Sequence, residues 1–171
     1  MTALSCQLTT TRSADRPLIF RWKFLGYRVT FTFAPVVEVQ GVNSRIDDDH
    51  HILMWDFDNH PIEIVAYALR VVQRHWNLPD IRILRSSKGK HYLAYSLMRT
   101  PWPLAMRIIA ATDGIDLNFF KFGVYRGHFT LRTSKKKGQQ PHFVRLLPGE
   151  RRETVKIGEL KSWTTYETLR D

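Results

Sequence analysis

Short apolar runs and stretches of helical spacing alternate along residues 52–125, and this alternation limits the folds that the chain can adopt. Apolar runs bounded by turn residues predict strands, and apolar residues recurring every three to four positions predict helices. The expected strands are 52–57, 81–84, 91–97 and 118–125, and the expected helices are 61–75 and 101–112. The order is therefore β-α-β-β-α-β, the ferredoxin-like unit. Right-handed crossovers place the end of its first strand beside the starts of its third and fourth strands.

Further strands are expected on both sides of this unit. Residues 27–33 alternate between apolar and polar side chains, which predicts a half-buried strand that continues to Val39 after Pro35. Later strands are expected over 128–133 and 143–147. The predicted fold class is α+β, a ferredoxin-like core with extra N-terminal strands and a C-terminal β extension.

The domain organisation is expected to be simple. Residues 1–16 predict a flexible N-terminal segment, and residues 17–171 predict a single domain whose motifs lie within 50–147. Cys6 is the only cysteine, which excludes an internal disulfide and a cysteine-based zinc site and indicates a reducing, cytoplasmic location. No apolar run approaches the roughly 20 residues that span a bilayer, so no membrane partner is expected.

The charge of the chain indicates its class of partner. Lysine and arginine number 26 against 16 aspartates and glutamates, which gives a formal net charge of +10. An excess of this size favours a polyanion, usually nucleic acid, although charge can also serve solubility alone. Aromatic residues make up 12% of the chain and could stack on bases or pack in the core.

Two carboxylates follow the first apolar run. Asp56 and Asp58 alternate with Phe57, so both lie on one face of the expected strand. Adjacent carboxylates repel each other, and divalent cations such as Mg²⁺ remove that cost. Two metal ions held by carboxylates are the usual apparatus of phosphoryl and nucleotidyl transfer. The alternative is structural, with one carboxylate capping the next helix and the other exposed to solvent.

A polar turn opens the third expected strand. Ser86, Ser87, Lys88 and Lys90 supply hydroxyl and ammonium donors suited to a triphosphate, and His91 follows directly. The topology places this turn near the two carboxylates. A lone histidine in a strand is otherwise more often structural than functional.

The later part of the chain adds an acid and several cations. Asp116 precedes the fourth expected strand at the same edge of the sheet, as a third carboxylate or as an ordinary turn residue. Arg132 alternates with Thr130 and is expected to share a face with the acids, where an arginine suits phosphate binding. The remaining cations are expected to touch a nucleic-acid backbone without sequence preference. They are Arg126, Lys135, Lys136 and Lys137.

Three motifs in this order resemble those of the archaeo-eukaryotic primase superfamily, especially its compact viral and plasmid versions. They are the apolar strand ending in D-x-D at 52–58, the serine- and glycine-rich turn with histidine at 86–91, and the late acid with its basic strand at 116–135. The likeness covers about residues 50–147. Many family members place the third acid where this chain has Lys121 and Phe122.

The resemblance implies an RRM-like palm with template-directed attack of a 3′-hydroxyl on an α-phosphate and release of pyrophosphate. Asp56, Asp58 and Asp116 would bind two Mg²⁺ or Mn²⁺ ions, without zinc. Single-stranded DNA and nucleoside triphosphates would be the substrates, with a helicase or another replisome protein as a further partner. The nucleotide would be held by Ser86, Ser87, Lys88, Lys90, His91, Arg132 and Lys135.

Three other classes fit part of the pattern. A haloacid-dehalogenase-type phosphatase also has D-x-D after an apolar strand, but it needs a late acidic pair and a doubly wound α/β order. A rolling-circle replication endonuclease needs a His-hydrophobic-His motif, which the sequence lacks. A non-catalytic nucleic-acid-binding palm would keep the basic surface and use the acids only for structure.

Overall fold

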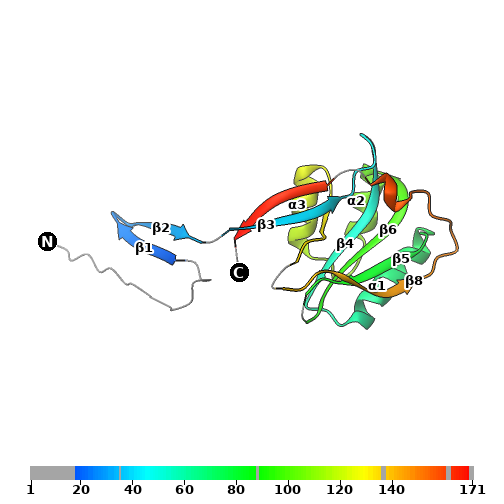
Figure 1. Cartoon of the computed structure of the whole chain (residues 1–171), viewed down its shortest axis with the longest axis horizontal. Helices are drawn as coiled ribbons and strands as arrows, with labels where there is room; N and C mark the ends of the chain where they lie inside the picture. Colours follow the sequence, from blue (N-terminus) through cyan, green and yellow to red (C-terminus); the bar gives the residue numbers. More distant parts are fainter. Residues whose placement is uncertain (1–17, 35, 88, 136–137, 161–162, 170–171) are drawn as a thin grey trace. The chain divides into compact units, whose positions relative to one another are not determined.

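The chain folds as an α+β protein with mostly antiparallel sheets and few helices (Figure 1). The computed structural model describes residues 18–34, 36–87, 89–135, 138–160 and 163–169, and the expected flexible segment 1–16 lies outside them. The strands are β1 (Leu18–Phe24), β2 (Tyr27–Phe33), β3 (Val36–Asn43), β4 (His50–Asp58), β5 (Ile81–Arg85), β6 (His91–Pro101), β7 (Thr130–Arg132), β8 (His142–Leu147) and β9 (Trp163–Leu169). The helices are α1 (Ile62–His75), α2 (Trp102–Ala110), α3 (Leu117–Arg126) and the 3₁₀ turn Ile157–Glu159.

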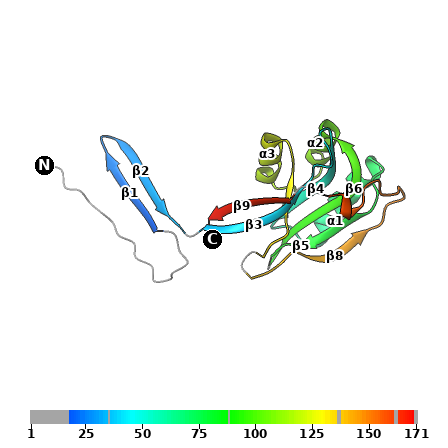
Figure 2. The same ribbon diagram turned by 45° about the horizontal axis from the view of Figure 1, so that its top comes forward.

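The chain divides into two compact units, one made of residues 1–38 with 166–171 and the other of residues 39–165. In the first unit, β1 and β2 pair antiparallel as a hairpin (Figure 2). The strand predicted over 27–33 is confirmed as β2, but its predicted half-burial is wrong, because every residue of β2 is exposed. Its predicted continuation to Val39 is also wrong, because residues 36–43 form the separate strand β3 in another sheet. The strand β1 was not among those predicted from the sequence.

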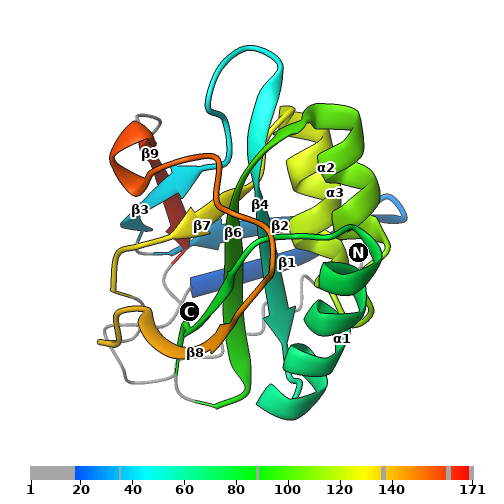
Figure 3. The ribbon, with the colours of Figure 1, turned by 90° about the vertical axis from the view of Figure 1, so that its right-hand side faces the viewer.

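The second unit is built on a four-stranded sheet in the order β4-β6-β5-β8 (Figure 3). All three strand pairs of this sheet are antiparallel. The structure confirms the expected strands β4, β5, β6 and β8 and the helices α1 and α2, with small shifts at their ends. A second sheet has the order β7-β3-β9, and β9 was not predicted.

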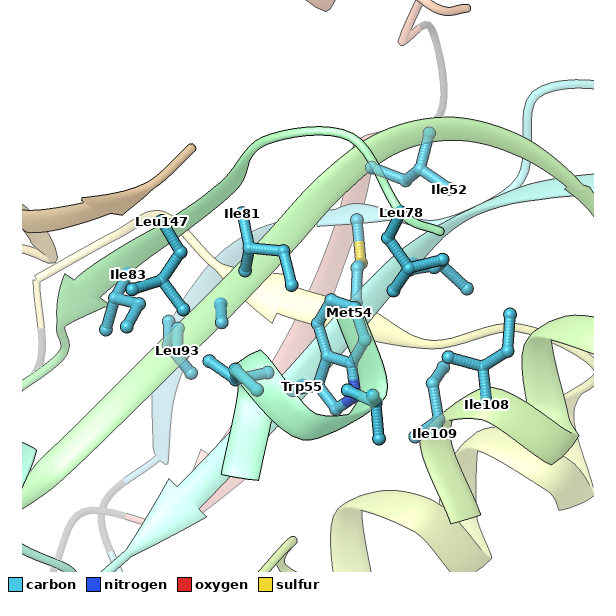
Figure 4. Packing of buried hydrophobic residues seen from close by; sticks show 14 of the residues in the cluster. Ile52, Met54, Trp55, Leu78, Ile81, Ile83, Leu93, Ile108, Ile109 and Leu147 are labelled. Carbon is cyan, nitrogen blue, oxygen red and sulfur yellow. The ribbon is translucent and has the colours of Figure 1, made fainter. Parts of the chain in front are cut away.

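Buried apolar side chains from the sheet and from α1 and α2 form the core (Figure 4). Trp55 is fully buried, and its indole Nε1 donates a hydrogen bond of 2.9 Å to Thr112 Oγ1 just beyond α2. Alternation along β4 therefore directs Trp55 and Phe57 toward α2 and directs Asp56 and Asp58 to the opposite face of the sheet. The core thus determines which face of β4 presents the two carboxylates.

The predicted strand over 118–125 is wrong, because these residues form the helix α3. Asp116 is its N-cap, and Gly127 ends it in the left-handed conformation with a φ of 71°. Within the helix, a Cβ at Gly123 would lie 2.2 Å from the ring of Phe129, so only glycine lets this fully buried ring pack there. The β-α-β-β-α-β order is accordingly not confirmed, since its fourth strand is absent beside β4.

Candidate functional site

The end of β4 and the starts of β6 and α3 meet at the edge of the main sheet that carries the two carboxylates of β4. Asp58 closes β4 and lies opposite His91, the first residue of β6, in the antiparallel register. The start of α3 joins them through the backbone, because Asp116 N donates to the carbonyl oxygen of Asp56 at 2.9 Å. The predicted convergence of these four residues is therefore present, although α3 replaces the strand that was expected to deliver Asp116.

The side chains of Asp58 and His91 are hydrogen-bonded, with 2.6 Å between Asp58 Oδ1 and His91 Nδ1. The Asp58 side chain is 51% exposed and that of His91 is 33% exposed. The turn before His91 contains Gly89 at a φ of 103°, a conformation that glycine adopts without strain. The pair thus lies at the surface, within reach of a dissolved ligand.

Asp56 lies deeper than Asp58 on the same face of β4. Burial falls along this face from the fully buried Met54, through the half-buried Asp56, to the exposed Asp58. Burial, together with the negative charges of Asp58 and Asp116, raises the pKa of the Asp56 carboxyl to about 7. Asp56 is therefore a carboxylate that a cation would stabilise.

The carboxylate of Asp116 is engaged at the start of α3. It accepts hydrogen bonds from the backbone N–H groups of Asn118 at 2.9 Å and Phe119 at 3.3 Å. Asp116 therefore has the structural role of capping α3, and its negative charge also helps to raise the pKa of Asp56.

The expected phosphate-binding residues gather in part. Ser86 is buried, its backbone N–H donates to the carbonyl of His91 at 3.0 Å, and its own carbonyl accepts from Arg132 Nη2 at 2.8 Å. Arg132 also donates to the carbonyl of Ser134 at 2.9 Å. The guanidinium is thereby held at the turn that carries His91. Ser87 is half-buried and Lys90 is exposed on this turn.

The other predicted cations are less closely placed. Lys135 is exposed three residues beyond Arg132, and Lys88, Lys136 and Lys137 lie outside the described residues. Arg126 is exposed at the end of α3, where its guanidinium lies 5.6 Å from the ring centroid of Phe122. It is therefore on the same helix as Asp116 but at the opposite end.

Exposed aromatic residues on α3 form a further group that was not predicted from the sequence. Phe122 and Tyr125 are exposed beside Lys121 and Arg126, and Tyr125 is 89% exposed. Aromatic rings interleaved with cations are typical of surfaces that bind single-stranded nucleic acid. Aromatic and basic residues are already adjacent to one another in the sequence of residues 121–126. The strand predicted there would have buried every second residue, so the two rings were not expected at the surface together.

The donor set suits a divalent metal ion bound by Asp56 and Asp58. Within the described ranges, no group of three histidine, cysteine, aspartate or glutamate residues is arranged to hold a metal. Mg²⁺ commonly uses one or two carboxylates and completes its shell with water and substrate phosphates, so a pair is sufficient for one ion. A second ion would need a further ligand, and the Asp116 carboxylate is occupied by the cap of α3.

The chain matches no protein-family model, no curated protein and no solved structure with which it was compared. The function of the site is therefore inferred from its own geometry. None of the helices in the described part of the chain has the length and apolar character needed to cross a bilayer.

Proposed function

We propose that the second unit is a primase-type palm that transfers nucleotides onto a growing strand along single-stranded DNA. The observation that carries this proposal is the arrangement of Asp56, Asp58 and His91 at one edge of an antiparallel sheet. Such an edge combines a negative site for a divalent cation with a histidine donor for phosphate oxygens. The +10 net charge supports a polyanionic template.

Each side chain takes a role that its position supports. Asp56 and Asp58 hold the divalent ion, which supplies electrostatic stabilisation of the α-phosphate and of the leaving pyrophosphate. His91 and Arg132 bind the triphosphate from the turn at Ser86. Asp116 fixes the start of α3 against the backbone of Asp56. In this proposal the ferredoxin-like order is modified, since α3 takes the place of the fourth strand.

The test is nucleotide incorporation on single-stranded DNA, with and without an annealed primer, in Mg²⁺ or Mn²⁺ and with labelled NTPs or dNTPs. We expect metal-dependent products that disappear in the Asp56→Ala, Asp58→Ala double variant. Products without a primer would make the protein a primase, and products only with a primer would make it a polymerase. An Asp113→Ala variant is the matched control, because Asp113 is an exposed carboxylate outside the site.

A second candidate is a nucleic-acid-binding palm without catalysis. The occupied carboxylate of Asp116 and the exposed aromatics of α3 favour this alternative. DNA binding that is equal in the native protein and the double variant, with no incorporation under any condition, would support it. A haloacid-dehalogenase-type phosphatase is not favoured, because the strand pairs of the main sheet are antiparallel.

A further inference from the structure

The β1–β2 hairpin of the first unit has two chemically different faces. Because directly opposed residues share a face, the strand register assigns every hairpin side chain to one side or the other. The apolar hairpin face consists of Leu18, Phe20, Trp22, Phe24, Tyr27, Val29, Phe31 and Phe33. The basic hairpin face consists of Ile19, Arg21, Lys23, Arg28, Thr30 and Thr32.

The apolar hairpin face is exposed along its whole length. Phe33 is 67% exposed and Phe31 is 56% exposed, and Phe20 alone among the eight residues is half-buried. Phe20 packs against its own neighbours on this face, with ring centroids 6.2 Å from Trp22 and 6.3 Å from Phe31. An isolated two-stranded hairpin is marginal in water, and an aromatic face of this extent needs a cover.

The distribution of charge identifies the chemistry of the cover. The apolar hairpin face carries no charged side chain, while Arg21, Lys23 and Arg28 all point the other way. A nucleic acid stacked on the rings would find its phosphates away from these cations, which makes it a poor occupant. A bilayer under the apolar face would likewise have the cations directed away from its headgroups. The fitting occupant is an apolar surface two strands wide and seven residues long.

We propose that the apolar hairpin face is a homodimer interface, in which the hairpins of two copies of this chain pack face to face. A second copy matches the face in length and width, and its basic hairpin face points outward, so like charges are kept apart. Covering six partly exposed aromatic rings, Leu18 and Val29 buries on the order of 800 Å² per copy, which is the size of a standard stable interface.

The test is the molar mass of the full-length, nuclease-treated protein in solution, measured by sedimentation velocity from about 1 to about 100 µM at high salt. We expect twice the mass of one chain at the upper concentrations. Hydrogen exchange of the native protein localises the contact, since amides within 18–33 should exchange more slowly at high than at low concentration. A monomer throughout this range, or slower exchange elsewhere only, would overturn the proposal.

Two lysine substitutions on one strand separate the faces. Phe31→Lys places a charge in the apolar hairpin face and is expected to weaken the dimer by roughly 30-fold or more. Thr30→Lys adds the same charge to the basic hairpin face and should leave the dimer intact. A Phe31→Lys protein that dimerises like the native one would exclude this surface. A native monomer that co-sediments with vesicles of neutral and anionic phospholipid would instead identify a bilayer as the occupant and reject the dimer.

Discussion

Asp58 and His91 face each other across β4 and β6, and their side chains form a hydrogen bond of 2.6 Å between Oδ1 and Nδ1. A carboxylate at Nδ1 favours the proton on that nitrogen and leaves Nε2 facing a ligand, to which it donates a hydrogen bond when the ring is an imidazolium. Asp58 therefore orients His91 in addition to adding charge beside Asp56.

Replacing His91 by alanine should weaken triphosphate binding and leave the fold intact. The side chain is partly exposed, so its loss creates no core cavity, but it removes a donor to phosphate oxygens. We expect the affinity for a fluorescent ATP analogue to fall by about tenfold to 100-fold, measured by anisotropy in Mg²⁺. His142→Ala, which changes an exposed histidine on β8, is the control and should bind like the native protein. Equal affinity of both variants for the ATP analogue would show that His91 does not bind the triphosphate.

Binding of a divalent ion should depend on pH near neutrality. Asp56 binds a cation only when it is deprotonated, and its pKa lies at about 7. Protons therefore compete below pH 7, and the apparent Mn²⁺ affinity should fall by about tenfold per pH unit there and level off above it. Calorimetry or Mn²⁺ spin resonance from pH 5.5 to pH 8.5 measures this. An affinity that is flat across this range would show that Asp56 is not a ligand.

The same carboxylate should destabilise the metal-free protein at alkaline pH. Its folded pKa of about 7 lies above the ordinary aspartate value of 3.8, so the folded state binds the extra proton between these values and loses stability as pH rises through them. Asp56→Asn should thus raise the free energy of unfolding by about 2 to 4 kcal/mol at pH 8 and change it little at pH 4. Urea unfolding with EDTA measures both, and Asp113→Asn is the exposed control. A variant that is no more stable at pH 8 would contradict the raised pKa.

The sequence was sufficient to place the centre of the site, because β4 and β6 follow from hydrophobic periodicity and antiparallel pairing brings Asp58 to His91. It failed at α3, where Phe119, Phe120 and Phe122 suggested a strand. Asp116 and Gly127 were signals in the sequence for the two ends of a helix. The close approach of Gly123 to Phe129, which this helix allows, could not be predicted from local propensity.

Other features could not be obtained from local pattern. The hairpin strand β1 was missed because no element was assigned to residues 18–24, although apolar and basic residues alternate there. Arg132 was expected near the acids, but its contact with the carbonyl of Ser86 depends on the pairing of β7 with β3. Gly41 allows that pairing, since a Cβ there would lie 2.8 Å from the carbonyl oxygen of Leu131. Such contacts join residues far apart in sequence and have no local signature.

Gly123→Ala should destabilise the second unit although alanine favours helices. A Cβ at this position would lie 2.2 Å from the fully buried ring of Phe129, and this clash outweighs the gain of about 1 kcal/mol in helix propensity. We expect a net loss of about 1 to 3 kcal/mol in the free energy of unfolding, measured by urea denaturation. Gly158→Ala is the matched control, because nothing lies within 4 Å of its Cβ, and it should change stability by less than about 0.5 kcal/mol. Equal effects would show that the ring of Phe129 can move aside.

Tyr125→Ala should weaken binding of single-stranded DNA and leave triphosphate binding unchanged. Tyr125 is 89% exposed on α3 between the cations Lys121 and Arg126, so its ring can stack on a base while they approach phosphates. We expect a loss of about fivefold to 100-fold in affinity for an oligothymidylate at low salt, measured by fluorescence anisotropy. Tyr67→Ala removes another exposed tyrosine, 70% exposed on α1, and should bind like the native protein. A loss in both variants would indicate nonspecific binding to exposed rings, and a loss in neither would move the template away from α3.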